Sequence, residues 1–288
     1  MITVFGSTGN TGSIVAKELL RRGKTVRVVA RNKAKVEGLV AAGASFFEGD
    51  VLDAASVSAA LEGAEGAYLL LPPDLQSNDL VARNDRITQN YVAGLTKHGV
   101  KHAALLSSVG AHLPSGTGPI VTAHRAERAL REVKPTVFTF VRAPYFMENV
   151  LGYAHPMKSD GVLPVFGGGE GHAFPMIATH DIALAAAEAL ANPPKENEIL
   201  ELDGPSAYSF EDAAKIASKV LGRDVKATAL PIDAMVPTLQ QFGFSANVAG
   251  LFREMTEAFG NGTVRMEGVG RVVRGKTTFD TVLGALRS

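Results

Sequence analysis

The sequence predicts an α/β fold, a doubly wound parallel sheet followed by a smaller and mostly helical C-terminal lobe. Three observations support this. Short β-branched apolar runs alternate with amphipathic stretches through the first half of the chain, a glycine-rich turn closes the first run, and the alternation loosens after Pro144. Parallel strands need crossover connections, and helices supply them on both faces of a sheet.

The elements follow from these periodicities in chain order. We expect strands at residues 2–6, 25–31, 44–50, 66–72, 101–108 and 136–144, and helices at 11–22, 33–41, 54–61, 78–97 and 119–133. Beyond them, 165–175 is typical of a glycine-rich loop, 179–191 of a helix and 231–259 of further helical structure. Ser209 and Asp212 mark the start of a helix that stops at Gly222.

Composition excludes several classes of function. With 29 basic and 29 acidic residues the net charge is zero, which disfavours nucleic acid as a partner. The chain has no cysteine, so disulfides, thiolate metal sites and thiol catalysis are excluded, and its histidines show no metal-ligand spacing. No apolar stretch approaches the ~20 residues that cross a bilayer. We therefore expect a cytoplasmic protein with no metal and no membrane contact.

A glycine turn follows the first predicted strand. Gly6, Gly9 and Gly12 stand at intervals of three, just before a predicted helix. The first N–H groups of a helix attract an anion such as a pyrophosphate, and glycine lets the phosphates approach the backbone. A plain structural turn is the alternative, but the strand before it and the helix after it favour a Rossmann-type dinucleotide site.

Basic residues follow the second predicted strand, where NAD-specific proteins place an acidic side chain on the ribose. Arg31 stands there, with Lys35 close behind. A guanidinium pairs with a 2′-phosphate that a carboxylate would repel, so these residues favour NADP(H) over NAD(H); a merely exposed basic patch is the alternative. Asp50 ends the third strand and either meets the adenine or caps the helix near Asp53, and both readings stay open.

These observations define two parts of the chain. Residues 1–150 are predicted to form an NADP(H)-binding Rossmann domain, to which 176–203 returns. Residues 151–288 are predicted to form a smaller substrate-binding lobe.

Taken together, VFGSTGNTG, RNKAK, GDVLD, LLSSVGA and RAPYFMENV resemble the NmrA-like, atypical branch of the short-chain dehydrogenase/reductase superfamily. That branch includes NADPH-dependent quinone, azo-dye and triphenylmethane reductases, and also redox-sensing regulators. The resemblance covers essentially the whole chain. It implies cofactor contacts at Gly6, Ser7, Thr8, Gly9, Asn10, Thr11, Gly12, Arg31, Lys35, Asp50, Val51, Leu71, Pro72, Phe146 and Asn149.

The usual catalytic pair of this superfamily, a tyrosine with a lysine four residues later, is missing from the sequence. Reducing a ketone creates a basic alkoxide, and losing its proton donor typically costs 10²–10⁴-fold in rate. A quinone needs less help because its reduced anion is delocalised. The absence therefore fits hydride transfer to a quinone or similar conjugated acceptor, and it fits equally well a protein without catalysis.

Three residues, His124, Arg125 and Ser107, are candidate substitutes for the missing pair. His124 and Glu127 share a helix face, and a carboxylate beside the imidazole would keep it available as a proton donor. Arg125 could steady the nicotinamide ribose or an acceptor oxygen; a solvated, charged helix face is the alternative for His124, Glu127 and Arg125. Ser107 ends the preceding strand and could donate to the nicotinamide or acceptor, or serve only in loop structure.

The acceptor pocket is expected to be apolar and flat, with Tyr145, Phe146, Phe242 and Phe244 in its wall. We predict an NADPH-dependent oxidoreductase that passes hydride to a small apolar or aromatic acceptor, with a quinone leading. The alternative is a non-catalytic NADP(H)-sensing regulatory protein that acts through a partner. A homodimer is compatible with either.

Overall fold

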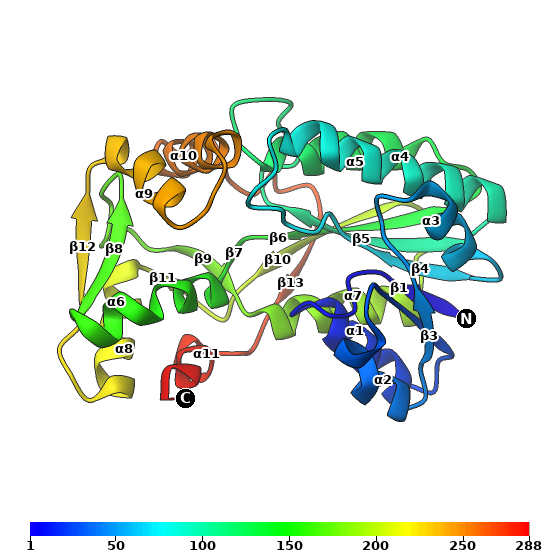
Figure 1. Cartoon of the computed structure of the whole chain (residues 1–288), viewed down its shortest axis with the longest axis horizontal. Helices are drawn as coiled ribbons and strands as arrows, with labels where there is room; N and C mark the ends of the chain where they lie inside the picture. The colour runs from blue at the N-terminus through cyan, green and yellow to red at the C-terminus, as the bar shows by residue number, and fades with distance from the viewer. Residues whose placement is uncertain (288) are drawn as a thin grey trace.

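A parallel sheet forms the centre of the molecule (Figure 1). The computed structural model describes residues 1–287. In spatial order the strands are β13 (Arg271–Arg274), β10 (Glu198–Asp203), β6 (Val137–Ala143), β5 (His102–Ser108), β4 (Gly66–Leu69), β1 (Ile2–Val4), β2 (Val26–Ala30) and β3 (Ser45–Glu48). Every pairing in this sheet is parallel. The predicted α/β class and doubly wound sheet are confirmed.

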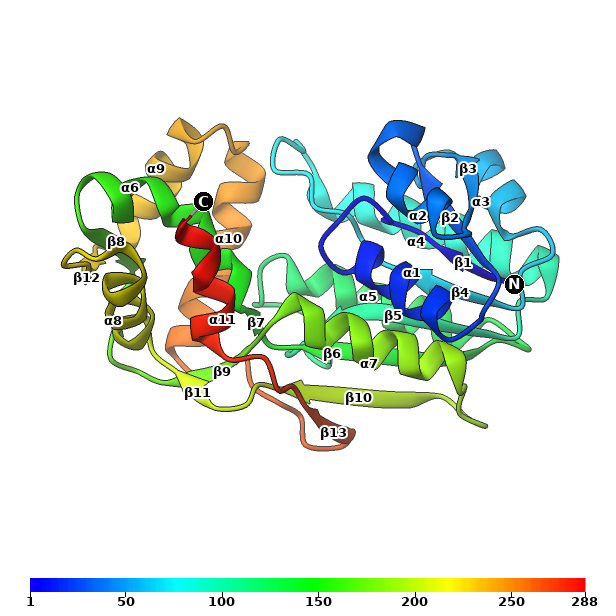
Figure 2. The same ribbon diagram turned by 90° about the horizontal axis from the view of Figure 1, so that it is seen from below.

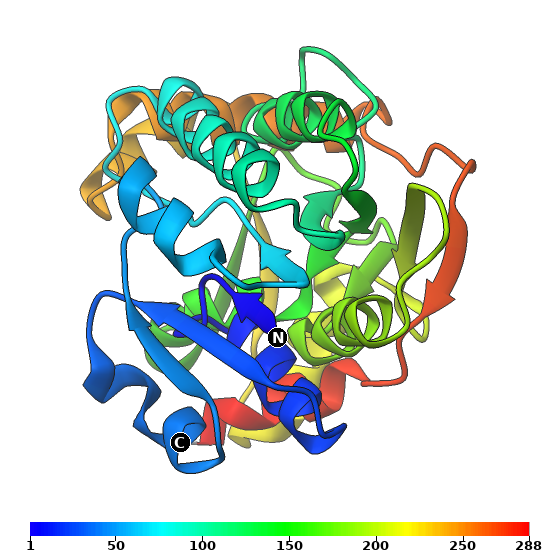
Figure 3. The ribbon, with the colours of Figure 1, turned by 90° about the vertical axis from the view of Figure 1, so that its right-hand side faces the viewer.

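Helices cover both faces of this sheet, as Figures 1 and 3 show. One face carries α1 (Gly12–Arg21), α2 (Glu37–Ala41) and α7 (Thr179–Ala191), and the other carries α3 (Ala54–Leu61), α4 (Leu80–His98) and α5 (Ile120–Arg131). A separate apolar cluster lies under each helix layer. Burial of these two clusters is the main force that holds the layers together.

Side-chain caps set several helix boundaries. Ser209 and Asp212 form a reciprocal capping box at the start of α8 (Phe210–Leu221), and Gly222 ends the helix in the left-handed conformation, so this prediction is confirmed. The predicted helix 33–41 is instead split into a 3₁₀ turn, η1 (Lys33–Val36), and α2. The Asn32 side chain accepts the N–H of Ala34, and this tight local turn replaces the first α-helical turn.

A smaller lobe lies beyond the carboxyl ends of the central strands (Figures 1 and 2). It contains short strands as well as helices: β7 (Tyr145–Phe146), β8 (Val162–Phe166), β9 (Phe174–Ile177), β11 (Ala207–Tyr208), β12 (Lys226–Leu230), α6 (Ala154–Ser159), α8, α9 (Met235–Gln241), α10 (Ala246–Gly260) and α11 (Phe279–Leu283). Three 3₁₀ segments accompany them, η2 (Met147–Tyr153), η3 (Ile232–Ala234) and η4 (Gly284–Arg287). The chain returns to the main sheet through α7 and β10, and again at β13. The division at residue 150 stays a prediction.

Helix α10 attaches this lobe to the loops that follow β4 and β5. The N–H of Ser245 donates to the Leu75 carbonyl at 2.8 Å, and the N–H of Leu80 donates to Asn247 Oδ1 at 3.0 Å. A Cβ on Gly118 would lie 2.0 Å from the Leu251 carbonyl oxygen, so only glycine permits this close approach. Helix α10 therefore lies against the carboxyl edge of the sheet.

Candidate cofactor and acceptor site

The glycine turn between β1 and α1 has the geometry of a phosphate cradle. Gly6 has a φ of +64°, which only glycine adopts readily, and its carbonyl accepts the N–H of Gly9 at 2.9 Å. A Cβ on Gly12 would lie 2.3 Å from the Gly6 oxygen. Because α1 begins at Gly12, the positive end of its dipole lies at this turn, and the N–H groups of Ser13 and Ile14 donate to the turn carbonyls of Gly9 and Thr11.

The buried side chains of the turn are held by neighbouring strands. Ser7 Oγ donates to the Val29 carbonyl at 2.8 Å, and Thr11 Oγ1 accepts the Tyr68 hydroxyl at 3.0 Å. Burial raises the pKa of Tyr68 well above its usual range, so this phenol keeps its proton. These bonds leave the backbone, with the exposed Thr8 and Asn10, to face a ligand.

A cavity of about 320 Å³ opens between the carboxyl ends of β2 and β3. It is lined by Arg31, Phe47, Glu48, Gly49, Asp50, Asp53 and Ser56. Among the described residues that line it, Arg31 is the only cation. The exposed Lys35 lies nearby in sequence on η1. The cavity lies where the adenosine end of a dinucleotide is bound in sheets of this type.

The two readings of Asp50 can be compared directly. Asp53 caps α3, since its Oδ1 accepts the N–H of Ala55 at 3.0 Å. Asp50 instead closes a tight turn, with its Oδ1 accepting the N–H of Leu52 at 2.9 Å. Asp50 therefore does not cap the helix, and its carboxylate lines the cavity.

Helix α4 anchors the loops that follow β3 and β4. Asn90 donates to the Val51 carbonyl at 2.9 Å, and Arg83 donates to the Pro72 carbonyl at 2.9 Å. Leu71, next to Pro72, is half-buried in the same corner. These bonds hold the proposed contacts Val51, Leu71 and Pro72 in place without occupying their side chains.

The segment after β6 is anchored by a carboxylate. Glu148 accepts the N–H of Thr179 at 2.9 Å and its hydroxyl at 2.7 Å, which caps α7 from outside the helix. Phe146 is half-buried against the main core and Asn149 is exposed. Both remain proposed cofactor contacts.

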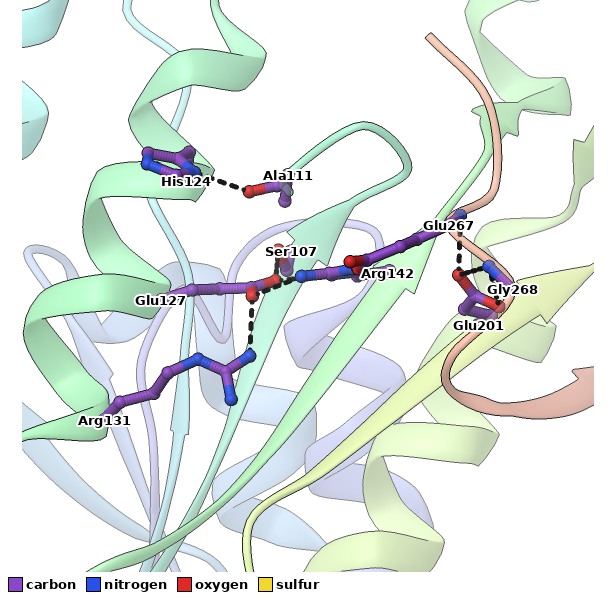
Figure 4. Close-up of polar contacts among 9 residues, drawn as sticks. All are labelled: Ser107, Ala111, His124, Glu127, Arg131, Arg142, Glu201, Glu267 and Gly268. Carbon is purple, nitrogen blue, oxygen red and sulfur yellow. Dashed lines mark hydrogen bonds and ion pairs between the residues drawn. The ribbon is translucent and has the colours of Figure 1, made fainter. Parts of the chain in front are cut away.

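A buried ion pair lies between β6 and α5 (Figure 4). Glu127 is 3% exposed and Arg142 is 5% exposed. Arg142 Nε and Nη2 donate to the two carboxylate oxygens at 2.9 and 2.8 Å, and Ser107 Oγ donates to Glu127 Oε1 at 2.6 Å. Burial alone would raise the pKa of Glu127, but the hydrogen bonds and charge of Arg142, with the Ser107 bond, outweigh it and lower that pKa.

The expected pairing of His124 with Glu127 is wrong. His124 Nδ1 lies 2.9 Å from the Ala111 carbonyl oxygen and donates to it (Figure 4). Glu127 instead faces Arg142, because a buried carboxylate gains more from a bidentate guanidinium than from an imidazole one turn away.

The other two catalytic candidates also bond within the protein. The Ser107 hydroxyl is 5% exposed and its proton is committed to Glu127. Arg125 forms a bidentate ion pair with Asp85 on α4, at 2.8 and 2.6 Å. The guanidinium thus bridges α4 and α5, and this geometry does not support a contact between Arg125 and the nicotinamide ribose.

The four aromatic residues expected in one pocket wall are separated. Tyr145 packs edge-on against Phe174 and Phe210, with ring centroids 5.6 and 5.8 Å apart. Phe244 packs edge-on against Phe252 of α10, with ring centroids 5.6 Å apart, and Phe242 is 74% exposed. The expectation of a single flat wall is therefore wrong, because Tyr145 and Phe244 join different apolar clusters.

Sequence reasoning missed the buried network around Arg142. Its Nη1 pairs with Glu267, and Glu201 accepts the N–H groups of Glu267 and Gly268 at 2.9 Å (Figure 4). The network ties the segment before β13 to the sheet. One signal was available, an arginine within an apolar strand, because a charge in a buried strand requires a partner.

The described residues contain no cluster of three or more His, Asp or Glu side chains that could hold a metal ion. Among the helices of residues 1–287, none combines the length and apolarity that a bilayer crossing requires.

The fold and the turn geometry together define a dinucleotide-binding α/β protein. The chain belongs to the NmrA-like family, whose model matches residues 1–276.

Two curated relatives align with most of the chain. NAD(P)H azoreductase of Xenophilus azovorans is 27% identical over 259 residues, 88% of this chain and 86% of the relative. Quinone oxidoreductase 2 of Escherichia coli (strain K12) is 28% identical over 271 residues, 88% of this chain and 90% of the relative.

Two solved structures share the fold. The Escherichia coli NADPH-dependent quinone oxidoreductase complexed with NADPH gives a TM-score of 0.81 at 24% identity, and the Citrobacter sp. triphenylmethane reductase complexed with NADP(H) gives 0.80 at 21%. Each alignment covers 99% of both chains.

Proposed function

We propose that this protein is an NADPH-dependent oxidoreductase that transfers hydride to a small conjugated acceptor, with a quinone as the leading acceptor class. The observation that carries the proposal is the glycine turn at Gly6–Gly12 together with the Arg31 cavity, which fit the diphosphate and the phosphorylated adenosine of NADPH. The relatives named as NAD(P)H azoreductase and quinone oxidoreductase support the same class.

The residues of the turn fit the diphosphate of this cofactor. A side chain at Gly12 would collide with the turn itself, and the positive end of the α1 dipole favours an anion at this point. Arg31 would pair with the 2′-phosphate, while Asp50 would accept from the adenine or ribose. Bound in this way, NADPH supplies the hydride.

The acceptor would meet the cofactor at the carboxyl ends of β4, β5 and β6. Phe146 offers an apolar surface there, and α10 lies across the loops after β4 and β5. A conjugated acceptor suits this edge because no tyrosine–lysine pair is present to protonate an alkoxide.

A second candidate, a non-catalytic NADP(H)-sensing protein, is favoured by one observation. All three predicted catalytic side chains are hydrogen-bonded within the protein. On this view, cofactor binding would change the affinity for a partner without turnover.

One experiment separates the two candidates. Purified protein is mixed with NADPH and a panel of quinones, azo dyes and triphenylmethane dyes, while absorbance of the reduced cofactor is followed. We expect oxidation well above the rate without protein, fastest with quinones. Saturable NADPH binding with no added oxidation across the panel would reject the enzyme and favour the sensor.

A further inference from the structure

The loop of residues 109–119 joins β5 to α5 at the carboxyl edge of the sheet. In the proposed site the glycine turn after β1 holds the diphosphate, and the cavity after β2 and β3 holds the adenosine. The opposite end of the cofactor must then extend toward β4, β5 and β6, on the other side of β1. This loop is therefore next to the reacting ring.

The loop is held from two sides. On the α5 side, His124 donates to the carbonyl of Ala111. On the α10 side, the Leu251 carbonyl approaches Gly118 closely, and a Cβ on Gly110 would lie 3.0 Å from a methyl group of Val264. These contacts restrain the backbone on both sides of His112.

Two buried polar atoms in this loop lack a hydrogen-bond partner, His112 Nδ1 and Thr117 Oγ1. Within residues 1–287 only one other side-chain atom shares this condition, Arg83 Nε, and that atom lies 3.1 Å from a carboxylate oxygen of Asp74. An unpaired buried polar group costs about 1–3 kcal/mol, so it calls for a functional explanation such as a ligand. Thr117 is fully buried and His112 is half-buried.

Two of the other proton-bearing side chains at this edge are already engaged. Ser107 donates to Glu127, and His124 donates to Ala111. His112 carries the side-chain type that exchanges protons near neutral pH.

We infer that His112 is a catalytic residue whose imidazole donates a proton to the acceptor oxygen or nitrogen that hydride transfer leaves negatively charged. The inference rests on the proposed function. The acceptor gains two electrons and one hydrogen as hydride while NADPH is oxidised to NADP⁺. The imidazolium N–H breaks as the acceptor O–H or N–H forms, and the neutral imidazole then regains a proton from water.

Acceptors differ in whether they need this proton. A quinone takes one hydride and one proton to become a hydroquinone. A cationic triarylmethane dye takes hydride at its central carbon and becomes neutral, so it needs no proton. His112 should therefore matter for the first acceptor and not for the second.

The test compares His112→Asn with the wild-type protein, using menadione as the quinone and crystal violet as the cationic dye. Asparagine keeps a polar group at the position of Nδ1 but cannot act as an acid. We expect kcat/KM for menadione to fall about 10-fold, below the usual range for a general acid because the quinone anion is delocalised. With crystal violet kcat/KM should stay within about twofold, and NADPH affinity should be unchanged.

The matched control is His155→Asn, at an exposed histidine on α6, which should change neither rate. His112→Gln provides a second variant if asparagine disturbs folding. Equal losses with both acceptors would assign His112 a structural role, and no loss with menadione would exclude it as the proton donor. A wild-type protein that oxidises NADPH with neither acceptor would instead overturn the proposed function, and the role of His112 with it.

Discussion

The two halves of the central sheet differ in how their functional residues are held. In the β1–β2–β3 half, the proposed contacts lie in short turns that local hydrogen bonds close, Gly9 to Gly6 and Leu52 to Asp50, and neighbouring strands then hold the side chains of the glycine turn. In the β4–β5–β6 half, polar side chains form ion pairs between different elements. Arg142 on β6 pairs with Glu127 on α5, and Arg125 on α5 pairs with Asp85 on α4. Local sequence therefore describes the first half well, while the second half depends on packing.

The largest effect is expected at the buried pair of the second half. Arg142→Met should lower the free energy of unfolding by about 3–5 kcal/mol, because Glu127 would stay buried without its main partner. Urea denaturation of the protein without cofactor measures this loss.

A matched control removes the other arginine that contacts the same carboxylate. Arg131 is 37% exposed and donates to Glu127 at 3.1 Å, so Arg131→Met should cost about 1 kcal/mol or less. Similar losses of unfolding free energy in the two variants would show that the burial of Arg142 does not determine how much the ion pair stabilises the fold.

The next largest effect is expected at the glycine turn of the β1–β2–β3 half. Gly12→Ala should destabilise the protein by about 1–3 kcal/mol, because its Cβ meets the Gly6 oxygen at 2.3 Å. At Gly9 the same oxygen would lie 3.4 Å from a Cβ, so Gly9→Ala should fold normally but bind NADPH more weakly. Thermal unfolding and NADPH titration of both variants measure the two effects. Unchanged NADPH affinity in Gly9→Ala would mean that no phosphate approaches this glycine.

A smaller effect concerns cofactor choice. Arg31→Gln should weaken NADPH binding about 10- to 100-fold, the value of a charge-assisted hydrogen bond, and leave NADH binding unchanged. Lys33→Gln, at an exposed lysine two residues away, serves as the control. Titration of each variant with both cofactors decides the point, and an equal loss for both would refute the assignment to the 2′-phosphate.

The smallest effect is expected at the surface pair of the second half. Arg125→Ala removes an ion pair whose arginine is 53% exposed, so it should cost about 1 kcal/mol or less and leave kcat and NADPH affinity unchanged. Asp85→Ala should behave in the same way. A large loss of turnover in Arg125→Ala, without a similar loss in Asp85→Ala, would show that this arginine acts in the acceptor site.

The elements that sequence reasoning predicted well have local causes. The capping box of Ser209 and Asp212 spans three residues, and the apolar runs of β5 and β6 need only a buried parallel sheet around them. The acceptor end was harder because α5 presents several polar residues, and their spacing permits more than one set of partners. Sequence periodicity placed Glu127 beside His124, whereas β6 supplied a stronger partner from the other side.

The sequence by itself determined the parallel sheet, the glycine turn and the basic residue after β2, because each follows from a short pattern with a local physical cause. Only the tertiary structure decided which polar side chains at β5 and α5 are hydrogen-bonded within the protein and which partners they have. Long-range packing sets those pairings, since a buried charge takes the partner that best replaces its lost hydration. The same packing left the Nδ1 of His112 without a partner, in a loop held between α5 and α10.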